Sequence, residues 1–346
     1  MNIKGGVVTN TARLSNRPLL SKEKSSSIKV FATSVIRCTK DSELTGFLFE
    51  IDWLENRIKK KIPIPLNTTH PFWNSRGGNR GGRGVVYHKG VLYVATAMSI
   101  LMFDDSLHKI GELSHPHFGG LHEIFIDDEG IWVTSTLHDL IIKIDFNGST
   151  IEEWFACDSE ILQKEFNFPR RKLNLNLDFP ADNFVNHYEN YCKEEIFHLN
   201  SIYPHNNSLY FLSYRLNAFI RFKPEAKVIL IDKELGAPHN GMISPNNQVI
   251  INDTKNQCLR VYDLETGKRL QSLVTAVYGT RENSVQFASS GWQRGLFPVD
   301  DSIYLVGTSP ATIFEVDLKK AVIGQVCQLD SDVRHCIHGL TVARGF

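Results

Sequence analysis

The sequence predicts an all-β fold, a six-bladed β-propeller with four-stranded antiparallel blades. Three observations predict it. Short β-rich runs recur along the chain, and turns rich in Gly, Asn and Asp separate them. The runs group in fours with a period of roughly 40 residues, which is typical of propeller blades. Finally, six segments that each open one such group align on a short pattern whose first residue is never apolar.

Three groups show the repeat most clearly, and each supplies four expected strands. The expected strands are Gly84–Tyr87, Val91–Thr96, Ser99–Phe103 and Lys109–Leu113; then Glu123–Ile126, Ile131–Thr136, Leu140–Ile144 and Thr150–Trp154; then Gly241–Ile243, Gln248–Asn252, Cys258–Tyr262 and Arg269–Val274. Asp127–Gly130 and Glu265–Gly267 are examples of the intervening turns, which hold residues that tolerate the tight backbone of a hairpin. Each group therefore predicts one antiparallel sheet.

The two ends of the chain are expected to complete one blade together. Only one strand can follow His338, and the three missing strands are found near the N-terminus at Val30–Val35, Gly46–Ile51 and Arg57–Ile64. The last strand would then be the innermost of that blade, and this closure removes the free sheet edges that invite aggregation. We expect a single propeller over residues 29–346, preceded by a polar, mobile head at residues 1–28.

Two insertions interrupt the repeat. The aligned segments follow one another at 39, 41 and 44 residues in three cases, but at 76 and 55 in the other two. The extra residues lie at about 155–196 and at 276–291, each between the last strand of one blade and the first strand of the next. Such long connections tend to be functional loops, and we expect them to form lids over one end of the propeller axis.

Composition limits the class of function. The chain has 346 residues, of which 42% are hydrophobic, and its 38 Lys and Arg balance 38 Asp and Glu. This charge balance favours neither a nucleic-acid partner nor a membrane surface. No apolar run is long enough to span a bilayer, and the first 28 residues lack the apolar core of a signal peptide. The six cysteines form no CxxC pair, so we expect reduced thiols and a cytoplasmic protein.

The first positions of the six aligned segments carry the functional prediction. In chain order they are Arg83, His122, His198, His239, Arg294 and His338. Residues at the start of the innermost strands can face the propeller axis, with Cα atoms roughly 6 Å from it. Imidazoles reach about that far, so the four histidines are predicted to bind one transition metal, either Fe(II) or Zn(II).

The two ring arginines indicate an anion beside this metal. Arg83 and Arg294 flank His338 in the ring, and guanidinium groups pair with carboxylates. We therefore expect both arginines to bind a small anionic, carboxylate-bearing substrate and to stabilise negative charge during catalysis. Further candidates for substrate binding are Trp292, Asn240 and His117.

Two interpretations of the ring compete. In the first, the protein is a metalloenzyme, an oxygenase or a lyase, which the insertion at 155–196 closes over its substrate. In the second, the histidines only cap strands and bond to loop carbonyls, and the propeller is a non-catalytic scaffold for a protein partner. The second interpretation predicts that the protein binds no stoichiometric metal.

Several segments resemble known propellers. His198–Ile202, Pro238–Gly241, Gly291–Leu296 and Leu305–Ser309 resemble an uncharacterised group of bacterial propeller proteins over about residues 190–310. Asp253–Tyr262 is similar to the second and third strands of NHL-type blades. These resemblances imply the fold and carry no known activity.

The ring is also similar to the sites of two enzyme families. The lyase domain of peptidylglycine amidating enzyme holds an axial zinc with three histidines beside arginines. That resemblance implies His122, His198 and His239 as zinc ligands, with Arg83 and Arg294 facing the substrate, and the fourth ring histidine departs from it. Carotenoid-cleaving oxygenases hold iron(II) with four histidines, but on seven blades and a longer chain, so this similarity concerns the site alone.

Overall fold

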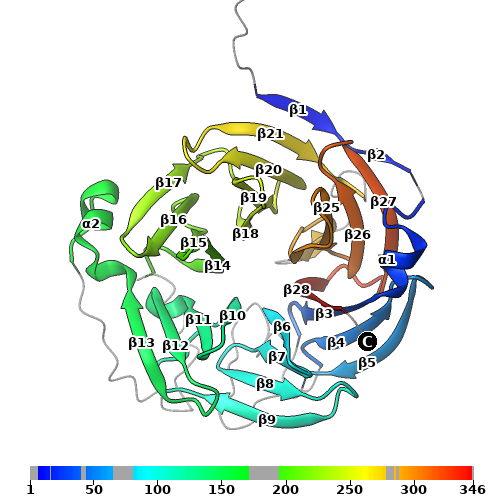
Figure 1. Cartoon of the computed structure of the whole chain (residues 1–346), viewed down its shortest axis with the longest axis horizontal. Coiled ribbons are helices and arrows are strands. Elements are labelled where there is room, and N and C mark those ends of the chain that lie inside the picture. The colour runs from blue at the N-terminus through cyan, green and yellow to red at the C-terminus, as the bar shows by residue number, and fades with distance from the viewer. Residues whose placement is uncertain are drawn as a thin grey trace, which may run out of the picture.

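Six β-sheets surround one axis and form a six-bladed propeller (Figure 1). The computed structural model describes residues 7–15, 17–39, 44–64, 81–170, 195–277, 284–285 and 288–344. The predicted fold class is confirmed, because each of these six sheets contains four antiparallel strands with the innermost strand at the axis (Figure 1).

The first three blades follow one another without interruption by other strands. Blade 1 consists of β6 (Val85–His88), β7 (Val91–Ala95), β8 (Ser99–Phe103) and β9 (Lys109–Ser114). Blade 2 consists of β10 (Ile124–Ile126), β11 (Ile131–Ser135), β12 (Leu140–Ile144) and β13 (Thr150–Phe155). Blade 3 consists of β14 (Leu199–His205), β15 (Ser208–Ser213), β16 (Ala218–Lys223) and β17 (Lys227–Ile231).

The other three blades complete the circle. Blade 4 consists of β18 (Pro238–Ile243), β19 (Gln248–Asp253), β20 (Cys258–Asp263) and β21 (Arg269–Val274). Blade 5 consists of β24 (Leu296–Pro298), β25 (Ile303–Thr308), β26 (Thr312–Asp317) and β27 (Val322–Gln328). Blade 6 consists of β28 (His335–Arg344), β3 (Ile28–Ile36), β4 (Phe47–Asp52) and β5 (Arg57–Pro63).

Blade 6 closes the ring as predicted. Its innermost strand β28 pairs antiparallel with β3, with Leu340 opposite Ala32 and Val342 opposite Val30. The two strands come from opposite ends of the chain, so their hydrogen bonds hold the propeller shut.

The core lies between blades. Side chains of the inner and middle strands interdigitate with those of the next blade, as when Tyr93 and Ile100 of blade 1 share one buried cluster with Val133 and Ile142 of blade 2. In β12 all five residues are buried. Both faces of such a strand are covered, which explains why four of its five residues are apolar.

The N-terminal segment differs from the separate head that the sequence analysis predicted. β1 (Val8–Thr11) pairs parallel with β21, and β2 (Arg13–Leu14) pairs parallel with β27. The short helix α1 (Lys22–Ser26) follows, next to blade 6 (Figure 1). The outer edges of blades 4 and 5 carry backbone groups that need partners, and an extended polar segment can supply them.

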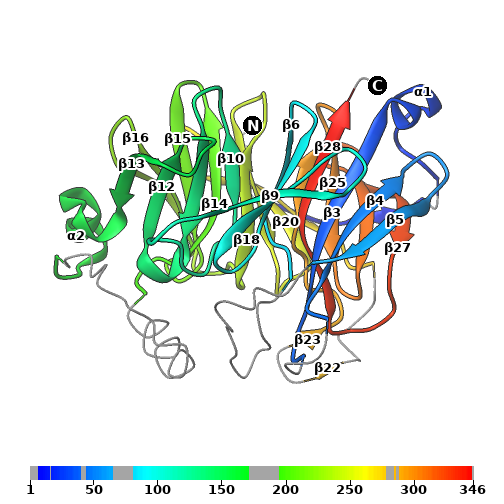
Figure 2. The same ribbon diagram turned by 90° about the horizontal axis from the view of Figure 1, so that it is seen from below.

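The described parts of the two insertions lie in different places. Of the longer one, a single helical turn (Ala156–Asp158) and the helix α2 (Glu160–Phe166) lie on the outer rim of the propeller (Figure 1). Residues 171–194, on which the predicted lid mostly rests, lie outside the described residues. The shorter insertion contains a small hairpin of β22 (Ser284–Val285) and β23 (Ala288–Ser289), on the face from which β28 starts (Figure 2). Among the helices described, none has the length and apolar character needed to cross a membrane.

Candidate functional site

The four ring histidines lie together at one end of the propeller axis. Each stands at or just before an innermost strand, so the blade geometry turns it inward. The imidazole centroids of His122 and His198 are 5.0 Å apart. Those of His122, His239 and His338, which come from alternate blades, form a triangle with sides of 5.6, 6.1 and 6.4 Å.

Backbone carbonyls favour one tautomer in two of these rings. His122 Nδ1 lies 2.9 Å from the Gly120 carbonyl oxygen, and His239 Nδ1 lies 2.8 Å from that of Ala237. A carbonyl oxygen only accepts hydrogen bonds, so each Nδ1 carries the proton and each Nε2 keeps its lone pair. Arg83 Nη1 also lies 3.3 Å from His122 Nδ1, a longer contact that is then between two donors. A threonine hydroxyl adds a second contact to each Nδ1: Thr136 at 2.9 Å and Thr254 at 3.1 Å.

His198 is held by a carboxylate instead. Its Nδ1 lies 2.6 Å from Glu195 Oε2, and the Glu195 side chain is almost fully buried. Asp139 positions this segment, because its carboxylate accepts hydrogen bonds from the backbone N–H groups of Ile196, Phe197 and His198. Burial raises the pKa of Asp139 to about 6. His198 itself has a left-handed backbone with φ of 52°, which turns its side chain relative to the neighbouring blades.

The environment keeps three of the ring histidines neutral. Burial lowers the pKa of His122, His239 and His338 well below 6.5. After burial, the next largest cause is a guanidinium group, that of Arg83 for His122 and that of Arg294 for the other two. His338 Nδ1 is also buried without a hydrogen-bond partner among the described residues.

Three buried arginines surround these imidazoles. Arg83 is 2% exposed and Arg294 is 8% exposed. The third is Arg37, which is 4% exposed and contributes to the lowered pKa of both His239 and His338. Trp292 joins two of them, because the guanidinium carbons of Arg37 and Arg294 lie 4.6 and 5.4 Å from the centroid of its ring.

Sequence reasoning missed Arg37, although the repeat contains a signal for it. Arg37 immediately follows β3, the second strand of its blade. The residues at the same position in the six blades form a second inner ring: Arg37, Thr96, Thr136, Tyr214, Thr254 and Ser309. Three of them contact the ring histidine of their own blade, through the two threonine hydroxyls already described and through Tyr214, whose ring centroid is 5.0 Å from that of His198. Aligning this second position would have identified Arg37.

A series of hydrogen bonds crosses the axis at the residues that directly follow the ring positions. Asn240 Nδ2 donates to Glu123 Oε1 at 2.8 Å, and Asn240 Oδ1 accepts from the backbone N–H of Gly295 at 2.8 Å. Burial raises the pKa of Glu123 to about 8. At the equivalent position of blade 1, Gly84 lets the backbones of blades 1 and 2 approach closely, because a Cβ there would lie 2.8 Å from Glu123 Cα. Asn240, predicted to bind substrate, therefore links blades 2, 4 and 5.

The donor set suits a metal, but the spacing is wide. An ion about 2.1 Å from three Nε2 atoms would place the imidazole centroids roughly 5 Å apart. The triangle of His122, His239 and His338 is larger, and in the described part of the chain these rings do not form a group whose ligand atoms all lie within 4.8 Å of one another. A shared ion would require the rings to turn inward.

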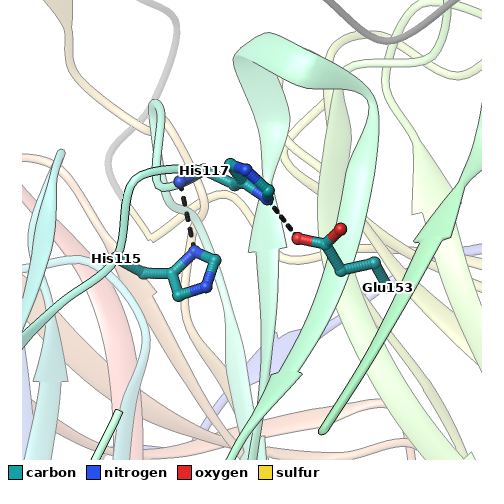
Figure 3. Close-up of side chains that lie close together, drawn as sticks. All are labelled: His115, His117 and Glu153. Atoms are coloured by element: carbon teal, nitrogen blue, oxygen red, sulfur yellow. Dashed lines mark hydrogen bonds and ion pairs between the residues drawn. The ribbon is translucent and has the colours of Figure 1, made fainter. Parts of the chain in front are cut away.

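His117 lies apart from the axis. It precedes blade 2 in a loop and bonds through Nδ1 to Glu153 of β13, the outermost strand of that blade (Figure 3). Its backbone N–H donates to His115 Nδ1 at 3.1 Å. The structure therefore groups His117 with His115 and Glu153, whose ligand atoms lie within 4.8 Å of one another, and not with the predicted substrate-binding residues.

Comparison with known proteins supports the fold alone. No family model and no curated protein matches the chain. Among solved structures, the chain is similar to a protein of unknown function from Bacteroides caccae, with a TM-score of 0.54, 11% identity, and coverage of 92% of this chain and 100% of that one.

Two further structures are similar. One comes from the nidogen–laminin complex, with a TM-score of 0.53, 11% identity, and coverage of 91% of this chain and 98% of that one. The other is a catalytically inactive virginiamycin B lyase from Staphylococcus aureus with quinupristin, with a TM-score of 0.43, 14% identity, and coverage of 72% and 69%. The resemblance to bacterial propellers of unknown function is thus confirmed at the level of the fold.

Proposed function

We propose that the protein is a metal-dependent enzyme that binds a small anionic, carboxylate-bearing substrate at the axial end where the ring residues lie. One observation carries this proposal: three arginines that are 2–8% exposed converge on neutral imidazoles. Arg83 donates to the carbonyl oxygen of Leu121 and so already has a partner. A carboxylate bound among the three guanidinium groups would add charge-assisted hydrogen bonds to them.

The residues divide into two roles. Arg37, Arg83 and Arg294 hold the substrate carboxylate, and Trp292 supports two of the guanidinium groups from one side. The buried Nε1 of Trp292 has no hydrogen-bond partner among the described residues, which provides a further donor for an anion. Electrostatic donors fixed in advance stabilise negative charge that develops on the substrate.

His122, His239 and His338 are the best candidates to hold the metal, with His198 as a fourth. The tautomers fixed at His122 and His239 leave their Nε2 lone pairs available, and neutral imidazoles suit Fe(II) and Zn(II) equally. When bound, zinc would supply Lewis-acid polarisation and iron would supply O2 chemistry. These alternatives correspond to a lyase and an oxygenase, and the donor set does not favour either one.

The alternative function is a scaffold for a protein partner. The similar propeller in the nidogen–laminin complex comes from such an assembly. A scaffold that binds through its outer surface does not use a positively charged cluster at the axis, whereas an enzyme with an anionic substrate does. The charged axis therefore favours the enzyme.

Metal content tests the proposal. Purified protein and the variants His239→Ala and His338→Ala are compared by elemental analysis after incubation with Fe(II) or Zn(II) and removal of free metal. We expect each variant to lose one equivalent. His205→Ala, which removes a partly exposed histidine at the end of β14 in blade 3, is the control and should keep it. Equal metal content in all four proteins would refute an axial metal.

Anion binding tests the arginines separately. Calorimetric titration with malonate, a simple dicarboxylate, should detect binding to the wild-type protein. Arg37→Ala should weaken it by roughly 100-fold, because truncating one partner of a buried charge pair costs about 2–5 kcal/mol. Unchanged affinity in that variant would place the anion elsewhere.

A further inference from the structure

His115, His117 and Glu153 form a second cluster of metal-ligating side chains, which we call the rim cluster. It lies where the connection from blade 1 to blade 2 crosses the outermost strand of blade 2 (Figure 3). Each residue offers one ligand atom, and these atoms all lie within 4.8 Å of one another. The rim cluster is separate from the axial ring and plays no part in the function proposed above.

We propose that the rim cluster is a zinc site with two imidazole ligands and one carboxylate ligand. Two histidines with one glutamate are a known three-residue ligand set for zinc, which leaves a fourth position for water. The carboxylate also offsets part of the charge of the ion, in contrast to the arginine-rich axis.

The backbone conformation orders the imidazoles of His115 and His117 before any metal binds. Pro116 separates them, and its ring fixes φ near −65°. The N–H of Phe118 donates to the carbonyl oxygen of His115 at 3.0 Å, which closes a tight turn. The two imidazole centroids lie 4.9 Å apart in an edge-to-face arrangement. A site whose ligands are already ordered loses less conformational entropy on binding a metal.

The third ligand comes from a rigid strand. Glu153 lies within β13, opposite Ile142 of β12, so its backbone is held by the sheet. His115 makes a further contact with the same strand, because its Nε2 lies 2.8 Å from Thr150 Oγ1. An ion bound here would therefore tie the connection that leads to His122 onto the outer edge of blade 2.

The cluster is also open to an incoming ion. The side chains of His117 and Glu153 are 21% and 28% exposed, so an ion can reach them without unfolding of the blade. In the absence of metal, His117 and Glu153 bond directly to each other. Zinc would replace the shared proton of that contact, and the proton would leave to solvent. At His115 the ion would take the place of one of the two contacts of the ring, the N–H of His117 at Nδ1 or the Thr150 hydroxyl at Nε2.

The experiment measures zinc affinity by competition with a chromophoric chelator on metal-free, full-length protein. His117→Ala should weaken one zinc site by at least 100-fold, and Glu153→Gln should weaken the same site. His239→Ala leaves the rim cluster intact and should retain this site, which separates failure here from failure of the axial metal. His108→Ala removes another exposed histidine beside a carboxylate, Asp104, and is the matched control.

Cobalt(II) gives a second measurement. The His239→Ala variant, which lacks an intact axial site, should show the intense visible absorption of four-coordinate cobalt, and the double variant His117→Ala/His239→Ala should lose it. Zinc should also raise the thermal midpoint of His239→Ala but not that of the double variant. The proposal is overturned if His117→Ala and Glu153→Gln bind zinc as tightly and in the same amount as the wild-type protein.

Discussion

The axial ring and the rim cluster use the same side chain in opposite electrostatic surroundings. At the axis, the Nδ1 atoms of His122 and His239 bond to backbone carbonyls, and buried arginines lie beside the rings. At the rim, His117 bonds to a carboxylate, and the side chains reach solvent. The presence of histidines therefore does not decide which ligand a site binds; the charged groups beside the imidazoles do.

This difference indicates opposite binding preferences. Arginines beside neutral imidazoles favour an anion, with a metal only if an anion accompanies it. A carboxylate beside two imidazoles favours a cation directly. One variant at each place should therefore separate the two behaviours.

The largest effect is expected from reversing a charge at the axis. Arg294→Glu should weaken malonate binding by roughly 1,000-fold or more, about 4 kcal/mol, because it removes a donor and adds repulsion. Arg294→Lys keeps the positive charge but loses the planar guanidinium group, which can donate two parallel hydrogen bonds to a carboxylate. This variant should weaken malonate binding by roughly 10-fold. Calorimetry measures both, and zinc affinity at the rim should stay unchanged. If Arg294→Glu bound malonate normally, the contrast between the two clusters would fail.

A second effect concerns His138, which lies between the two clusters. Burial lowers its pKa to about 4; His117 of the rim lowers the pKa further, and Glu195, the partner of His198, raises it. Between pH 6.5 and 4 the unfolded chain binds a proton there that the folded protein does not. The free energy of unfolding should therefore fall as the pH is lowered, by about 3 kcal/mol from this residue.

His138→Gln removes that contribution. Chemical denaturation of metal-free protein at pH 7 and pH 4.5 should show a smaller loss of stability in the variant than in the wild-type protein. A loss as large as that of the wild type would mean that His138 is protonated in the folded state.

The smallest effects compare two threonines that contact a histidine nitrogen. Thr254 is buried, contacts His239 Nδ1 and donates to the Gln293 carbonyl. Thr150 makes the equivalent contact to His115 at the exposed rim. Thr254→Val should lower the free energy of unfolding by about 1–2 kcal/mol, and Thr150→Val by less than about 0.5 kcal/mol. Similar values for both variants would show that burial does not distinguish the two places.

The repeat made most of the fold predictable from sequence. Strands such as Leu140–Ile144 and Ser99–Phe103 were expected at the bounds that the structure shows, because turns of Gly, Asn and Asp mark their ends. The closure of blade 6 followed from counting strands. The attachment of Val8–Thr11 to β21 could not be predicted, because a polar strand that pairs through its backbone carries no apolar pattern.

The site was only partly predictable. The convergence of the ring histidines followed from their equivalent positions in the blades, since propeller symmetry brings such positions to one axis. Arg37 was missed because only one position per blade was aligned. The grouping of His117 with Glu153 depends on how a loop folds back over a neighbouring strand, and 36 residues of sequence separate the two.

Blade 6 has a consequence for the order in which the protein matures. β28 carries His338 and is synthesised after every other described strand, whereas its neighbour β3 leaves the ribosome among the first. A growing chain can assemble the hairpins of blades 1 to 5, but it cannot bring the six ring residues around one axis. The six ring residues can therefore come together only after translation has passed β28.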